Sequence, residues 1–206
     1  GETHQGVFDL SFLTTIPNMT VISPKNRWEM ADMLRFAVDF QYPVAVRYPR
    51  GTAYEGMRQF RAPIEYGKSE VLYEEEDIAI IFVGHMAELA DCVRRSLKET
   101  GYSCSLINAR FVKPLDTELL EELAKDHSLF VTIEENVITG GFGEQVMDYV
   151  SRAALNVHVR NIGISDEYVE HGNVEVLRKE VGLDRDAIVK QTISDYLRIM
   201  ENKKKR

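Results

Sequence analysis

The sequence has little cysteine and a shortage of basic residues. Its two cysteines, Cys92 and Cys104, lie in apolar segments with neither CxxC spacing nor a nearby histidine. This pattern predicts reduced thiols in a cytosol-like compartment and no metal or redox site. Lysine and arginine total 25 against 33 acidic residues, and the formal net charge is −8. A nucleic-acid partner is therefore not expected.

Long apolar runs and self-contained catalytic motifs are also missing. No run approaches the roughly 20 apolar residues that span a bilayer, and no signal-peptide pattern opens the chain. We therefore expect a cytoplasmic protein without a membrane partner. GxSxG, HExxH and SxxK motifs are absent, and neither His85 nor His171 has metal-ligand spacing to other ligands. Caps, turns or domain contacts are the roles expected for these two histidines.

What the sequence does contain is a regular alternation of short apolar runs and helical periodicity. Strands are predicted at 19–22, 44–48, 78–84, 105–108, 129–134 and 157–162. Helices are predicted at 28–38, 86–100, 116–125, 142–153, 174–182 and 184–200, with Ser23, Asp116 and Asp184 as caps. This order predicts an α/β fold, with a mostly parallel sheet covered by helices on both faces.

A domain boundary is predicted where neither periodicity persists. Prolines and glycines punctuate the polar stretch that follows the strand at 44–48, which is typical of a linker. We expect residues 1–52 to end one α/β domain, 53–67 to be the linker, and 68–200 to form a second α/β domain. Residues 201–206, which end in a basic run, are expected to be a solvated tail.

Three segments contain residue types suited to chemistry. His4 lies beside Gly6, and its imidazole can exchange protons near neutral pH, although a loop histidine bonded to a backbone carbonyl fits equally. Arg47 and Arg50 follow a predicted parallel strand, where ligands bind in open α/β sheets. They suit an anion such as phosphate, or else an interdomain ion pair. The Gly-rich run 140–143 after Glu134-Glu135-Asn136 favours tight strand-to-helix packing over anion binding.

A set of motifs in this order resembles the 1-deoxy-D-xylulose-5-phosphate synthases. The motifs are GETHQGVFD (1–9), IPNM (16–19), SP (23–24), RYPRG (47–51), RFVKPLD (110–116), EEN (134–136), GGFG (140–143) and GLD (182–184). The resemblance covers nearly the whole chain and implies the end of a pyrimidine-binding domain followed by a transketolase C-terminal domain. It implies a homodimer that uses thiamine diphosphate and Mg²⁺ to decarboxylate pyruvate. The two-carbon fragment joins D-glyceraldehyde 3-phosphate, and the product feeds isoprenoid, thiamine and pyridoxal synthesis.

The same resemblance implies roles for individual residues. His4 matches the active-site histidine that exchanges a proton with substrate oxygens, and Arg50 matches the arginine that anchors the phosphate of glyceraldehyde 3-phosphate. Arg47 is a weaker phosphate candidate or a structural residue. The family's metal and diphosphate motif, and its glutamate for the aminopyrimidine, would lie upstream of Gly1. We therefore expect a fragment that binds no cofactor or metal and is inactive alone.

Two alternatives to this fragment of a synthase stay open on the sequence. One is a β-type subunit of a 2-oxo-acid dehydrogenase or of a split transketolase, completed by another chain. The other is a non-catalytic dimerisation or binding module.

Overall fold

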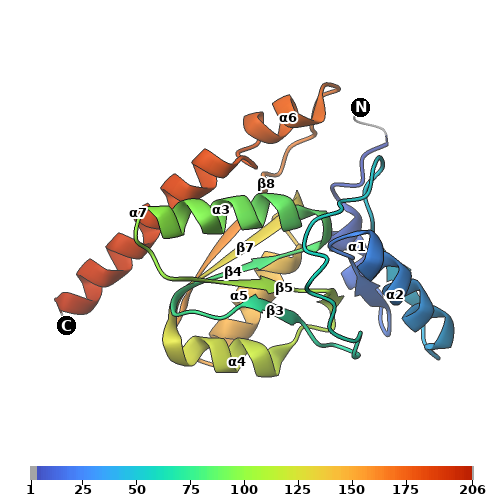
Figure 1. The fold of residues 1–206 in the computed structure, drawn as a ribbon, viewed down its shortest axis with the longest axis horizontal. Helices are drawn as coiled ribbons and strands as arrows, with labels where there is room; N and C mark the ends of the chain where they lie inside the picture. Colours follow the sequence, from blue (N-terminus) through green and yellow to red (C-terminus); the bar gives the residue numbers. More distant parts are fainter. Residues whose placement is uncertain (1–3, 206) are drawn as a thin grey trace.

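The computed structural model describes residues 4–205, in which strands and helices alternate (Figure 1). The strands are β1 Thr20–Ile22, β2 Val44–Val46, β3 Glu70–Tyr73, β4 Asp77–Phe82, β5 Cys104–Asn108, β6 Phe111–Lys113, β7 His127–Val137 and β8 His158–Ile164. The helices are α1 Asp9–Thr14, α2 Arg27–Asp39, the 3₁₀ turn η1 Gly84–Met86, α3 Ala87–Glu99, α4 Thr117–Asp126, α5 Phe142–Arg152, α6 Val174–Glu180 and α7 Arg185–Lys204. The predicted α/β class is confirmed.

The larger sheet has the strand order β3-β5-β4-β7-β8, and only β3 runs antiparallel to its neighbour. From β4 the chain passes through α3 to β5 on one side, whereas from β7 it passes through α5 to β8 on the other. The chain therefore reverses its direction of travel across the sheet between β4 and β7. In open α/β sheets, the crevice beyond the carboxyl ends of such a strand pair is where ligands bind.

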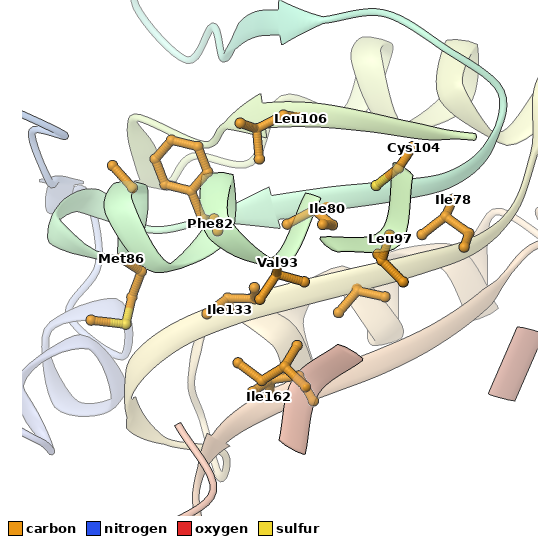
Figure 2. Close-up of a cluster of buried hydrophobic side chains, with 14 of the residues drawn as sticks. Ile78, Ile80, Phe82, Met86, Val93, Leu97, Cys104, Leu106, Ile133 and Ile162 are labelled. Atoms are coloured by element: carbon orange, nitrogen blue, oxygen red, sulfur yellow. The ribbon is translucent and has the colours of Figure 1, made fainter. Parts of the chain in front are cut away.

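Helices cover both faces of this sheet, as its continuous apolar strands require. On one face, Ile80 and Phe82 of β4 pack with Val93 and Leu97 of α3 (Figure 2), and α7 lies beside α3. On the other face, α4 and α5 cover Phe130 and its neighbours (Figure 1). Each such fully buried side chain contributes about 1.5–3 kcal/mol, so this double-sided core holds the β4 and β7 ends rigidly.

A smaller sheet joins the two parts of the chain that the sequence separates. Its order is β2-β1-β6; β1 is parallel to β2 and antiparallel to β6. Strand β6 follows β5 directly, so it comes from the part predicted as the second domain. Ile22, Met33 and Phe111 form the core between this sheet and α2.

A buried group of charged side chains makes a second connection between the parts. Lys25 Nζ lies 2.9 Å from Glu29 Oε1 and 2.5 Å from Glu70 Oε2. Arg110 Nε lies 2.8 Å from Glu29 Oε1, and its Nη2 lies 3.0 Å from Glu70 Oε1. Asn108 donates to both oxygens of Glu29. We call these five residues the buried charge cluster; its two positive and two negative charges balance, as burial demands.

The structure corrects one predicted helix cap and adds three elements. Ser23 does not cap α2; its hydroxyl donates to Arg47 O at 2.8 Å, and the cap is Asn26, whose side chain accepts from Glu29 N at 3.0 Å. The predicted caps Asp116 and Asp184 are confirmed. The added elements α1, β3 and β6 are at most six residues long, too short to establish a period.

The remaining sequence expectations concern thiols and membranes. Both cysteines are free, and burial raises the pKa of Cys104 to about 12, which makes its thiol inert. None of the helices formed by residues 4–205 combines the length and apolarity needed to cross a bilayer.

Candidate active site

Residues at the carboxyl ends of β2, β4 and β7 meet at the crevice beyond the β4–β7 strand pair. His85 lies in η1 just beyond β4, Glu135 lies near the end of β7, and Arg47 directly follows β2. Close approach is possible because residue 84 is a glycine at φ 54°, where a Cβ would lie 2.1 Å from Ser23 Oγ. Residues far apart in the sequence thereby reach one place.

Four side chains form a continuous network across this crevice. Arg47 Nη1 lies 3.0 Å from His85 Nδ1, and Arg47 Nη2 donates to Glu135 O at 2.9 Å. His85 Nε2 lies 3.1 Å from Glu135 Oε1. Glu135 Oε2 is bound by Arg178 of α6, with Nη2 at 2.6 Å. We call these four residues the Arg47–Arg178 network.

Burial and charge shift the pKa values in this network in opposite directions. Burial would raise the pKa of Glu135, but contact with His85 and the charge of Arg178 overcome it and lower the pKa to about 2. Burial lowers the pKa of His85 despite the opposing effect of Glu135. Glu135 is therefore charged and His85 neutral near pH 7. His85 lowers the pKa of Glu135 through its charge only when the imidazole is protonated. At neutral pH, where His85 is neutral, we therefore attribute the low pKa of Glu135 to Arg178.

The two residues that flank Glu135, Glu134 and Asn136, have separate structural roles. Glu134 is buried, and its two oxygens accept from Phe142 N and Gly143 N at 2.8 Å, at the start of α5. Burial raises the pKa of Glu134 to about 7, against these two donors. Asn136 accepts from Leu10 N and donates to Ser11 Oγ, which holds α1.

The GGFG turn packs α5 tightly onto β7, as predicted. A Cβ on Gly141 would lie 2.6 Å from Glu134 Oε2, and one on Gly143 would lie 2.4 Å from Thr132 Oγ1. The turn therefore needs small residues for packing, and the N–H groups of Phe142 and Gly143 are already occupied by Glu134.

The loop before α6 holds the segment that carries His4. Gln5 Nε2 donates to Val169 O at 2.6 Å, and Val169 N donates back to Gln5 Oε1 at 3.3 Å. The rings of Phe8 and Tyr168 meet edge to face, with centroids 5.7 Å apart. His4 is exposed at the end of this segment. The residues before His4 in the THQG motif lie outside the described residues.

Members of the Arg47–Arg178 network line two cavities. Arg50 and His85 line one, of ≈ 250 Å³, together with Tyr48. Gln5, Glu135 and Arg178 line the other, of ≈ 170 Å³. The structure thus places Arg50 at a cavity that His85 also lines, and Gln5, next to His4, at a cavity that Glu135 and Arg178 line. Two nitrogens of Arg47 are engaged by the network.

Sequence patterns missed two members of this network. Glu135 was noted only as part of the EEN motif. No sequence pattern pointed to Arg178, because its partner Glu135 lies 43 positions away. His85 makes the domain contact that was one of its three expected roles. His171 is exposed. Within residues 4–205, no three histidine, cysteine or carboxylate side chains gather as a metal site.

Comparison with known proteins identifies the family. Residues 67–188 match the model described as "Transketolase, C-terminal domain", and residues 1–55 match "Transketolase, pyrimidine binding domain". The chain belongs to the transketolase family. Both matched segments of this family meet at the crevice described above, the first through His85, Glu135 and Arg178 and the second through Arg47.

Similar curated proteins include two 1-deoxy-D-xylulose-5-phosphate synthases, which confirms the resemblance seen in the motifs. The one from Lachnoclostridium phytofermentans is 48% identical over 92% of this chain, and the one from Clostridium tetani is 43% identical over 94%. The chain spans 30% and 31% of these two relatives.

Two solved structures share the fold of this chain. A protein described as "Split gene transketolase, inactive beta4 tetramer" has a TM-score of 0.86 and 27% identity, covering 92% of this chain and 62% of its own. Campylobacter jejuni transketolase, at 18% identity and a TM-score of 0.70, shares the fold over 94% of this chain and 29% of its own.

Proposed function

We propose that this chain is part of a synthase that condenses pyruvate with D-glyceraldehyde 3-phosphate to give 1-deoxy-D-xylulose 5-phosphate and CO2. The supporting observation is the 48% identity to a protein of that name over 92% of the chain. Arg50 at a cavity on the carboxyl edge of the fold supports the same conclusion.

In this reaction the bond between the carboxyl and carbonyl carbons of pyruvate breaks and CO2 leaves. A new bond joins the carbonyl carbon to the aldehyde carbon of glyceraldehyde 3-phosphate, and one proton is taken up at the aldehyde oxygen. Thiamine diphosphate, when bound, supplies the electron sink for the decarboxylation. The family resemblance assigns the Mg²⁺ and diphosphate ligands to other parts of the complete protein, and we assign neither set to a residue of this chain.

Three residues of this chain have proposed roles toward the substrate. His4 delivers the proton to the aldehyde oxygen as the carbon–carbon bond forms. Arg50 pairs with the phosphate of glyceraldehyde 3-phosphate, since its exposed guanidinium presents a planar donor face. Arg47 is the weaker phosphate candidate, because His85 and Glu135 O already accept from it. We propose a cytoplasmic homodimer for the complete protein, and no activity for these 206 residues alone.

One observation favours a second candidate. The split-gene transketolase at TM-score 0.86 is described as an inactive tetramer of its β chain. By analogy, this chain would be a β-type subunit completed by a separate chain.

An activity assay separates the two candidates. The protein encoded by the complete gene is incubated with thiamine diphosphate, Mg²⁺, pyruvate and glyceraldehyde 3-phosphate, and CO2 and the ketose phosphate are measured. We expect equal amounts of both products from one polypeptide. Absence of CO2, or activity that appears only when a second gene product is added, would overturn the synthase proposal.

A further inference from the structure

The turn that carries Arg50 is anchored at Arg47. The backbone of Arg47 is fixed to the small sheet, since its N–H donates to Ile22 O at 2.8 Å and its carbonyl accepts from Ser23 Oγ. Its side chain leaves the sheet and crosses to the other part of the chain, where it meets His85 and Glu135 O. Tyr48 and Pro49 then lead to Arg50, and all three line the same cavity as His85.

The contact between Arg47 and His85 fixes the protonation of the imidazole. A guanidinium has five N–H donors and no acceptor, so Nδ1 of His85 must accept at the 3.0 Å distance from Arg47 Nη1. His85 is then the neutral tautomer with its proton on Nε2, the nitrogen that faces the Glu135 carboxylate. Histidine is suited to this place because one ring presents an acceptor to a cation and a proton to an anion.

The charged groups around His85 and Arg47 determine what protonation of the imidazole would do. Arg47 and Arg178 both act on His85 as positive neighbours, and Glu135 is the negative one. Asp9 and Glu134 add negative charge around Arg47. A proton added at Nδ1 would face the Arg47 guanidinium, so the hydrogen bond would be replaced by like-charge repulsion.

We propose that His85 is a positioning residue for the substrate phosphate site: as a neutral acceptor it holds Arg47, and through Arg47 it orients the 47–51 turn that presents Arg50. This inference rests on the proposed function. It assigns to a residue of the transketolase C-terminal domain a role in a site on the preceding segment.

The test is a steady-state kinetic comparison of three forms of the complete protein. His85→Leu removes the acceptor, whereas His85→Asn keeps an oxygen acceptor near the place of Nδ1. We expect His85→Leu to raise KM for glyceraldehyde 3-phosphate about tenfold, the loss of one hydrogen bond to a charged group. Its kcat and its KM for pyruvate should stay near wild type, and His85→Asn should restore most of the lost affinity.

A pH profile provides the second readout. As the pH falls through the pKa of His85, the wild-type KM for glyceraldehyde 3-phosphate should rise relative to that of His85→Asn. The substrate phosphate titrates equally in both measurements, so the ratio of the two KM values isolates the imidazole. If His85→Leu fails to fold, this ratio decides alone.

Other outcomes would overturn the inference. An unchanged KM for glyceraldehyde 3-phosphate in His85→Leu would contradict it, as would a loss confined to kcat in both variants or a KM ratio that is flat with pH. Failure of the proposed function is a different result, because wild-type protein would then form no product from pyruvate and glyceraldehyde 3-phosphate.

Discussion

His85 links a single imidazole to the stability of the fold. Its pKa in the folded chain lies below the usual value of 6.5 because the ring is buried. The unfolded chain therefore takes up this proton first as the pH falls. The stability that neutral His85 contributes is present above pH 6.5 and is lost as the pH falls toward the folded pKa.

We predict that the free energy of unfolding falls more steeply for the wild type than for His85→Asn between pH 7 and pH 5. Urea unfolding at several pH values measures this difference. Parallel stability curves for the two proteins would show that His85 does not titrate differently on folding.

Glu134 offers a second prediction for a single side chain. Both of its oxygens accept from backbone N–H groups at the start of α5, so Glu134→Ala would leave two buried donors without an acceptor. We expect a loss of about 1–3 kcal/mol of unfolding free energy at neutral pH, measured by urea unfolding. The matched control is Glu74→Ala on the exposed surface, which should change stability by less than about 0.5 kcal/mol. Equal losses in the two variants would contradict the role of Glu134.

Local sequence reveals some of these residues and hides others. His4 and Arg50 became candidates because each lies in a short motif, THQG or RYPRG, that resembles the synthases. The Arg47–Arg178 network depends on four segments that only the folded chain brings together, and no spacing rule connects Arg47 to Arg178.

The start of α2 shows how a local signal can mislead. Ser23 followed by Pro24 has the composition of a helix start, yet the helix begins at Arg27 and the serine hydroxyl bonds to Arg47 O instead. Asn26 is the cap and also donates to Gly56 O at 3.0 Å in the linker. The competition between local and distant acceptors for a serine hydroxyl is decided by tertiary structure.

Substitution of the cap tests this assignment. Asn26→Ala should lower the unfolding free energy by about 1–2 kcal/mol, through the lost cap and the lost linker bond. Asn26→Asp keeps the capping oxygen and should lose less. Urea unfolding followed by circular dichroism compares the two variants, and an Asn26→Ala protein as stable as the wild type would mean that the cap contributes nothing.

The two parts of the chain are joined more closely than their sequence suggests. A linker with prolines and glycines separates them, yet β6 completes the sheet of the first part and the buried charge cluster draws on both. Hydrophobic periodicity predicted most helices and the parallel strands. Periodicity could not predict that the two parts pack together, because β6 is only three residues long and buried ion pairs produce no regular spacing in the sequence.

Breaking the buried charge cluster should destabilise both parts together. Glu29 is 2% exposed, and Glu29→Gln would leave Lys25 and Arg110 with one carboxylate between them. We expect a loss of about 3–5 kcal/mol in a single cooperative transition. Calorimetry measures this loss of unfolding free energy. The control is Glu65→Gln on the exposed surface, which should unfold like the wild type. Two separate unfolding transitions, of which one keeps its wild-type midpoint temperature, would show that the two parts fold independently.

The proposal that this chain provides the phosphate site of a synthase is tested by one kinetic measurement on the complete protein. Arg50→Ala should raise KM for glyceraldehyde 3-phosphate about 10- to 100-fold, because a hydrogen-bonded charge pair with the phosphate is lost. KM for pyruvate should not change, and exposed Arg58→Ala should match the wild type. A KM for glyceraldehyde 3-phosphate that is the same in Arg50→Ala and wild type would contradict the account.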